Sequence, residues 1–213
     1  MSIKLVTMTL YSISKFLVKV LAKILLRLEV KGRSNIPRVG GFILASNHAS
    51  FLDPIVLGVA CPRRLNFMAR HDLFSIPVLG AFIRRVGAFP LKRDYADIGS
   101  IKEALRRLGQ AVGLVLFPEG TRASGGLAER AEPGVGFIAA KSGVPVVPAF
   151  INGTKRALAP GARFIRPTKV RVYFGKPVYV NNSGLKDNYA EFAMKVIQEI
   201  KRLNQERGNI KDD

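Results

Sequence analysis

Residues 42–61 read FILASNHASFLDPIVLGVAC, and this stretch decides the fold. It opens with a short charge-free apolar run, Phe42–Ser46, which predicts a buried β-strand. It closes with a second apolar run, Pro54–Cys61, which predicts a helix because proline is favoured in the first turn. A strand that enters a helix through a short polar loop is a building unit of α/β sheets, whose sites lie beyond the strand ends.

The same alternation of apolar runs and helical patterns continues along the chain. Further buried strands are predicted at Leu65–Ala69, Gly113–Phe117 and Val144–Ile151, and a more exposed, alternating strand at Val170–Phe174. Other helices are predicted at Leu73–Val86, Ile98–Ala111, Gly134–Ser142 and from Tyr189 to Gly208. The expected fold class is therefore α/β, a single layered domain with a mixed or mostly parallel central sheet flanked by helices.

Length and apolar pattern divide the 213 residues into three parts. Residues 1–30 form a helical N-terminal segment, 31–208 the folded domain, and 209–213 a loose C-terminal tail. A polar stretch with several glycines, Glu29–Gly41, is expected to connect the first two parts without regular structure.

The N-terminal segment has the pattern of an amphipathic helix. Its charge-free run, Leu5–Ser14, is shorter than the roughly 20 apolar residues that span a bilayer. Cations then recur every fourth residue, so that they form one stripe on a helix: Lys15, Lys19, Lys23 and Arg27. A helix packed on the core with a solvated basic side would show a similar pattern. The breadth of the apolar face favours a helix that lies in the membrane interface.

The charge of the chain narrows the class of partner. Lys and Arg total 34 against 15 acidic residues, a net charge of +19. Such a surplus selects anionic partners, either a membrane surface, a phosphorylated substrate or nucleic acid. We expect an anionic membrane surface and no nucleic acid, because the chain has no aromatic patch interleaved with cations and no nucleic-acid recognition motif.

Cysteine and histidine are scarce. Cys61 alone excludes an internal disulfide, and its apolar surroundings predict a buried structural thiol. His48 and His71 do not form a zinc-ligand pattern with it, so no metal site is expected.

His48 and Asp53 are the candidate catalytic residues. On a regular helix, a spacing of five residues would leave their side chains about 140° apart, so they would not meet. A loop can instead fold His48 back over the start of the helix, where Asp53, the expected N-cap before Pro54, accepts a hydrogen bond from the imidazole. The pair would then be the base and orienter of a catalytic triad without a protein nucleophile. The spacing is equally compatible with a histidine that only satisfies a buried loop and an aspartate that only caps the helix.

Two other segments end in cations that could hold a phosphate. Phe117–Arg122 follows a predicted strand, and Gly120 permits a tight turn there. Arg122 offers a planar fork for a phosphate, and Glu119 could orient it or bind substrate hydroxyls. Gly87–Arg93 also ends in cations. Each segment, taken alone, could be a solvated turn.

Together these segments resemble the conserved blocks of the glycerophospholipid acyltransferases, the family of bacterial 1-acylglycerol-3-phosphate acyltransferases. Asn47–Asp53 resembles the family's His-x-x-x-x-Asp block, and Gly87–Arg93 resembles the second block. Phe117–Arg122 has the sequence of the third, Phe-Pro-Glu-Gly-Thr-Arg, and Val144–Pro148 resembles the fourth. All four occur in the family's order.

The resemblance implies an activity and a role for each residue. His48 would be the general base and Asp53 would orient it. Five residues would hold the glycerol phosphate: Arg93, Glu119, Gly120, Thr121 and Arg122. The acceptor would be 1-acylglycerol 3-phosphate (lysophosphatidate), and the donor acyl-CoA or acyl-carrier protein, with no cofactor and no metal. Residues 31–208 would be the catalytic domain, on the cytoplasmic face of the cell membrane as a peripheral or monotopic protein.

The sequence departs from the family pattern at two places. Ala49 stands where an Arg or Gln is usual, and Ala131–Gly134 has an acidic residue where many members carry a lysine. No role is therefore transferred beyond Arg122. Two alternatives stay open: the same chemistry on glycerol 3-phosphate or another lysophospholipid, and, more distantly, a non-enzymatic basic module that binds membranes or nucleic acid.

Overall fold

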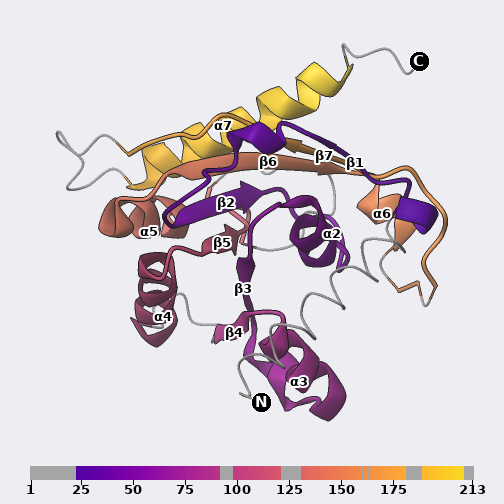
Figure 1. Ribbon diagram of the computed structural model, residues 1–213, viewed down its shortest axis with the longest axis horizontal. Helices are drawn as coiled ribbons and strands as arrows, with labels where there is room; N and C mark the ends of the chain where they lie inside the picture. Colours follow the sequence, from indigo (N-terminus) through magenta and orange to yellow (C-terminus); the bar gives the residue numbers. More distant parts are fainter. Residues whose placement is uncertain are drawn as a thin grey trace.

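A seven-stranded sheet runs through the protein in the order β1-β7-β6-β2-β5-β3-β4 (Figure 1). The computed structural model describes residues 23–91, 98–120, 131–159, 161–162, 164–180 and 189–208. The strands are β1 Glu29–Lys31, β2 Phe42–Ser46, β3 Leu65–Arg70, β4 Ala88–Leu91, β5 Gly113–Leu116, β6 Val146–Asn152 and β7 Arg171–Phe174. The expected α/β class with a mixed, mostly parallel sheet is confirmed.

Five neighbouring strands, β6, β2, β5, β3 and β4, run parallel to one another. β7 pairs antiparallel with β6, and β1 pairs parallel with β7. The carboxyl ends of the five parallel strands therefore meet on one side of the sheet, which we call the carboxyl side. The loops that follow β2 and β5 there carry His48 and Glu119.

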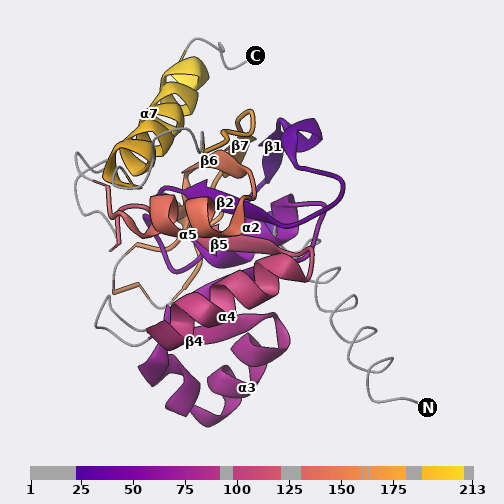
Figure 2. The ribbon, with the colours of Figure 1, turned by 90° about the vertical axis from the view of Figure 1, so that its left-hand side faces the viewer.

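Helices cover both faces of the sheet (Figures 1 and 2). They are α2 Asp53–Ala60, α3 Pro77–Arg85, α4 Ile98–Gly109, α5 Gly134–Ser142, α6 Thr154–Ala157 and α7 Tyr189–Gly208, with 3-10 turns η1 Arg33–Asn35 and η2 His71–Ser75. α4, α5 and α7 pack on one face, and α2 packs on the other.

The central strand β2 contributes to the hydrophobic core on both faces. Phe42 and Leu44 pack on the side of α2, while Ile43 and Ala45 pack on the side of α4, α5 and α7. All four side chains are fully buried. Successive side chains of a strand point to opposite faces, so a strand covered on both faces has a continuous apolar sequence.

A partly buried arginine network fixes the chain where it enters β4. Arg107 Nη1 donates to Asn66 Oδ1 at 2.6 Å and to the carbonyl oxygen of Gly87 at 2.8 Å, and its Nε donates to Glu103 at 2.7 Å. Hydrogen bonds from Arg106 and Arg107 lower the pKa of Glu103 from 4.5 to about 2. The network links α4 to β3 and to the residue that precedes β4.

Three predictions about secondary structure were wrong. The strand predicted as exposed at Val170–Phe174 has Val172, Tyr173 and Phe174 buried, because β7 lies between β1 and β6 and is covered on both faces. The connection Glu29–Gly41 contains β1 and η1, although it was expected to be irregular. Its strand is only three residues long and pairs with a segment far along the sequence.

The single helix predicted at Leu73–Val86 is broken into η2 and α3. The break falls at Ile76, whose backbone is extended (φ −77°, ψ 116°). Because the ring of Pro77 clashes with a helical conformation of the residue before it, the first helix ends there and a new one starts at the proline. Within the segment Gly87–Arg93, Ala88–Leu91 form strand β4.

The predicted N-terminal segment lies mostly outside the described residues, as does the tail 209–213. Residues 23–25, at the end of that segment, are helical. Within the described part of the chain, no helix is both long enough and apolar enough to span a bilayer.

Candidate active site

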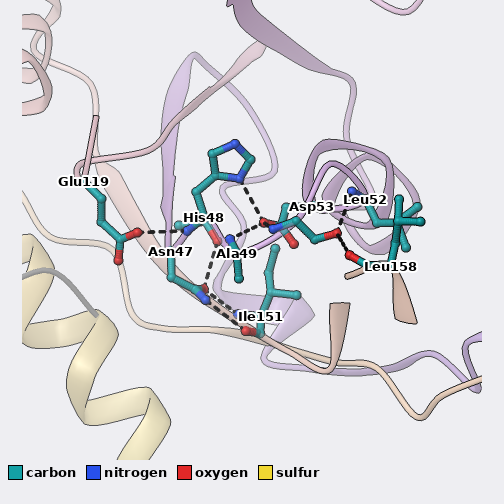
Figure 3. Close-up of polar contacts among 10 residues, drawn as sticks. Asn47, His48, Ala49, Leu52, Asp53, Glu119, Ile151 and Leu158 are labelled. Atoms are coloured by element: carbon teal, nitrogen blue, oxygen red, sulfur yellow. Dashed lines mark hydrogen bonds and ion pairs between the residues drawn. The ribbon is translucent and has the colours of Figure 1, made fainter. Parts of the chain in front are cut away.

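The loop after β2 is attached to the neighbouring strand by a side chain. Asn47 Nδ2 donates to the carbonyl oxygen of Ile151 at 3.0 Å, and Asn47 Oδ1 accepts from the N–H of Ile151 at 2.7 Å (Figure 3). Ile151 lies on β6, so the carboxamide of Asn47 makes the two hydrogen bonds that a backbone amide of a neighbouring strand would make in the sheet. The backbone of His48 can therefore leave the sheet while the end of β2 stays attached to it.

His48 and Asp53 form the hydrogen bond that the sequence predicts. His48 Nδ1 lies 2.9 Å from Asp53 Oδ2, and the two side chains are 18% and 0% exposed. An ionised carboxylate only accepts, so a neutral imidazole that bonds to it carries its proton on Nδ1 and has its lone pair on Nε2. Figure 3 shows Nε2 on the side of the ring turned away from Asp53. The geometry suits a base and its orienter, and the catalytic role stays a prediction.

The carboxylate of Asp53 also shapes the loop. Its Oδ2 accepts the backbone N–H groups of Ala49 at 2.6 Å and Ser50 at 2.8 Å. The prediction that Asp53 is the N-cap was wrong: the residue before the helix is Leu52, and the helix begins at Asp53 itself. The carboxylate points back to its own loop, because three donors converge on it from that side.

The turn after β5 contacts His48 from the other side. The ring of Phe117 stacks on the imidazole, with centroids 4.0 Å apart and planes inclined by 17°. Glu119 Oε2 accepts the backbone N–H of His48 at 3.3 Å (Figure 3). Phe117 restricts the plane of the ring and Glu119 restricts the backbone. The role expected for Glu119, orienting Arg122 or binding substrate hydroxyls, stays a prediction.

Gly120 forms the tight turn that the sequence predicts. Its φ is +68°, and its N–H donates to the carbonyl oxygen of Phe117 at 3.0 Å. Further along, the N–H of Glu132 donates to the carbonyl oxygen of Pro118 at 2.8 Å, so the chain returns to the same turn. A residue with positive φ favours glycine, which explains Gly120 here.

Three predicted substrate-binding residues, Arg93, Thr121 and Arg122, lie outside the described residues. The structure thus brings together His48, Asp53 and Glu119, with Gly120 beside them.

The serines on either side of His48 are occupied elsewhere. Ser50 is 3% exposed; its Oγ donates to the carbonyl oxygen of Leu158 at 3.1 Å and accepts the N–H of Leu52 at 3.3 Å. Ser46 is fully buried at the end of β2. Cys61, at the far end of α2, is 1% exposed, which confirms that the thiol is buried. None of the three has the exposed, base-linked position of a catalytic nucleophile.

Comparison with known proteins gives a consistent result. A family model described as acyltransferase matches residues 27–152, more than half of the chain. A 1-acyl-sn-glycerol-3-phosphate acyltransferase of Bacillus subtilis is 30% identical over 152 residues, which cover 71% of this chain and 73% of that protein. A chloroplastic enzyme of the same name from Brassica napus is 32% identical over 161 residues, covering 74% of this chain and 46% of that protein.

A solved structure has the same fold. The crystal structure of the 1-acyl-sn-glycerophosphate acyltransferase from Thermotoga maritima superposes with a TM-score of 0.73 at 28% identity, covering 87% of this chain and 74% of that one. The chain thus spans about half the length of the chloroplastic relative and about three quarters of the Bacillus and Thermotoga proteins.

Proposed function

The chain belongs to the acyltransferase family, and from this premise we propose that it transfers a fatty acyl group from a thioester carrier to the sn-2 hydroxyl of 1-acylglycerol 3-phosphate, giving phosphatidate. The observation that carries the proposal is the His48–Asp53 hydrogen bond of 2.9 Å, with the second ring nitrogen turned away from the carboxylate. The names of the Bacillus, Brassica and Thermotoga relatives support the choice of acceptor.

The reaction needs no nucleophile from the protein. His48 Nε2 takes the proton of the acceptor hydroxyl as its oxygen attacks the thioester carbonyl, and a tetrahedral oxyanion forms. The oxyanion collapses, the carbon–sulfur bond breaks, and the leaving thiolate takes the proton back from the imidazolium. Asp53 holds the ring in the tautomer that leaves Nε2 unprotonated at the start. The burial of Ser46 and Ser50 supports direct transfer.

Several backbone N–H groups near His48 are already engaged. Those of His48, Ala49 and Ser50 donate to carboxylates, and that of Gly120 donates within its own turn. An oxyanion needs donors that are free to aim at it. We therefore expect these donors among the other backbone N–H groups near Asn47–Asp53 or Phe117–Arg122.

The segment Phe117–Arg122 supplies most of the proposed contacts with the glycerol phosphate. Thr121 and Arg122, together with Glu119, Gly120 and the more distant Arg93, are the residues assigned to it. A guanidinium matches a phosphate with two parallel hydrogen bonds, which supports arginines in this role. The donor would be acyl-CoA or acyl-carrier protein, and neither a cofactor nor a metal takes part in the proposed steps.

The acceptor and product are membrane lipids, so the protein has to work at a membrane surface. We place it on the cytoplasmic face of the cell membrane as a peripheral or monotopic protein. The net charge of +19 supports an anionic surface, because each cation near such a leaflet contributes about 1 kcal/mol.

The proposed activity is tested by the product formed from each pair of substrates. Purified protein in mixed micelles receives lysophosphatidate or glycerol 3-phosphate as acceptor, each with an acyl-CoA or an acylated carrier protein as donor. We expect phosphatidate from lysophosphatidate with at least one donor. Exclusive acylation of glycerol 3-phosphate, or of an uncharged lysophospholipid added in its place, would reassign the acceptor. No acyl transfer under any combination, with a folded protein, would refute the proposal.

A further inference from the structure

Among the described residues, α3 packs mainly on η2 and β4, and most of its apolar side chains stay exposed. It lies at the end of the molecule beyond β4 (Figure 2), and Gly80 is its one buried residue. Val78 is 84% exposed, Phe82 45% and Leu79 37%, and Ile76, just before the helix, is 49% exposed. Exposing a contiguous patch of apolar side chains to water is unfavourable, so such a patch usually marks an interaction site.

The orientation of α3 aims these side chains outward. A side chain at Gly80 would collide with the carbonyl oxygen of Phe74, so this side of the helix packs on η2. At about 100° per residue, Val78 and Phe82 each lie about 160° around the helix from Gly80. They therefore point away from the body of the protein, where they can contact a partner.

The charges around the patch indicate the nature of that partner. Arg85 is exposed and lies about 20° around the helix from Val78, on the same outward side. Arg84 is exposed at the same end of the helix, over the ring of Phe74. Residues 73–91 contain two arginines and no acidic residue. Apolar side chains bordered by cations complement an anionic lipid surface.

Two other occupants are less complementary. A second copy of this chain carries the same net charge of +19 and would bring its own arginines to the contact. Residues 1–22 contain three lysines and no acidic residue, so they too would bring cations against Arg84 and Arg85.

We propose that α3, together with Ile76, is a membrane-docking surface that inserts Val78, Leu79 and Phe82 into the interface of an anionic phospholipid bilayer. The inference deepens the proposed function, on which it rests for the identity of the acceptor as a membrane lipid. η2 begins directly after β3, on the carboxyl side of the sheet, and leads into α3. Docking through α3 therefore holds the same side of the sheet that carries His48 close to the lipids.

The test compares two valines with almost equal exposure. Val78 is 84% exposed on α3, and Val39 is 83% exposed before β2, on the opposite side of the sheet. The full-length protein and its Val78→Asp and Val39→Asp variants are floated with vesicles of equal parts phosphatidylcholine and phosphatidylglycerol. We expect Val78→Asp to lower the partition coefficient about tenfold, because a valine leaves the lipid and a negative charge approaches it. Val39→Asp should change it less than about twofold.

A charge variant tests the second half of the proposal. Arg85→Gln should weaken binding to these vesicles about fivefold and leave binding to pure phosphatidylcholine vesicles unchanged, since about 1 kcal/mol is expected per cation near an anionic surface. Phe82→Asp, with melting temperature measured beside it, repeats the apolar test at a second position.

Three results would overturn the docking proposal. The first is equal partitioning of Val78→Asp and Val39→Asp, and the second is a lower melting temperature of Val78→Asp with unchanged partitioning, which would indicate that the chain covers α3 itself. The third is a change from dimer to monomer on Val78→Asp. Partitioning is measured without substrate. A protein that fails to acylate lysophosphatidate but loses vesicle binding on Val78→Asp would refute the proposed function and keep the docking surface.

Discussion

The loop after β2 and the turn after β5 both reach His48, but they are held in different ways. The β2 loop is fastened to three other elements: Asn47 binds Ile151 on β6, Ser50 binds Leu158 after α6, and Asp53 on α2 binds the loop itself. The β5 turn is closed by its own backbone bond and contacts His48 through one ring and one carboxylate. From this difference we infer that the β2 loop does most to fix the position of His48, while the β5 turn restricts the plane of its ring and adds one hydrogen bond to its backbone.

The largest effect is expected from removing the base itself. His48→Ala should lower kcat/KM for lysophosphatidate by about 10³-fold or more, within the range that general-base catalysis supplies, with little change in melting temperature. His71→Ala is the matched control, because His71 is the second of the two histidines in the sequence and is exposed in η2. Comparable losses in both variants would remove the basis for assigning the base to His48.

Asp53→Asn tests whether the β2 loop fixes the tautomer as well as the position. The variant keeps the size of the side chain but replaces the carboxylate that accepts Nδ1–H with an uncharged amide, which can turn its NH2 group toward the ring. We expect kcat to fall about 10²–10³-fold and KM for the acceptor to change little. Loss of charged hydrogen bonds to Ala49 and Ser50 should also destabilise the fold by about 1–3 kcal/mol, measured by urea unfolding. Near-normal turnover would mean that Asp53 is only structural.

Asn47→Ala tests the fastening of the β2 loop to β6. It leaves both the N–H and the carbonyl oxygen of Ile151 without their partner, at a cost of about 1–3 kcal/mol for each buried group. We expect a lower melting temperature and a roughly tenfold lower kcat, because His48 follows directly in the chain. Asn47→Asp keeps the acceptor and loses the donor, so its melting temperature and kcat should lie between those of the wild-type protein and Asn47→Ala. Equal activity in all three proteins would show that the pair of hydrogen bonds between Asn47 and Ile151 does not position His48.

Phe117→Leu should have the smallest effect, because it removes only the stacked ring and leaves the hydrogen bond between Glu119 and the backbone N–H of His48 in place. Leucine preserves apolar contact but not the flat surface 4.0 Å from the imidazole. We expect kcat to fall about threefold, with KM unchanged and stability lowered by less than about 1.5 kcal/mol. Phe164→Leu, at an 82% exposed position, is the control. A loss as large as that of Asn47→Ala would reverse the order in which the two loops matter.

The long buried elements of this fold are predictable from the sequence, and the short edge elements are not. β2 and β5 are apolar runs whose local pattern is sufficient. β1 and β4 are three and four residues long, and only their pairing with β7 and β3 identifies them as strands. The burial of β7 likewise depends on its position between two other strands, which the local sequence does not encode.

The same distinction holds in the candidate site. His48 and Asp53 are five residues apart, so spacing and the order of the sequence blocks suffice to pair them. Asn47 and Ser50 find their partners 104 and 108 residues away, and the stacking of Phe117 joins two separate strand ends. For the hydrogen bonds between Asn47 and Ile151, the only local sign in the sequence was an amide side chain at the end of a buried strand. The pairing of His48 with Asp53 was therefore predictable, and the contacts that hold the pair in place required the structure.

The most direct test of the account is a single-turnover experiment with acyl-labelled acyl-CoA and an excess of protein, with and without lysophosphatidate. If the acceptor hydroxyl is the nucleophile and His48 its base, labelled phosphatidate appears at the same rate as free CoA, the protein stays unlabelled, and no CoA is released without acceptor. Covalent label on the protein, or release of CoA in the absence of lysophosphatidate, would contradict it.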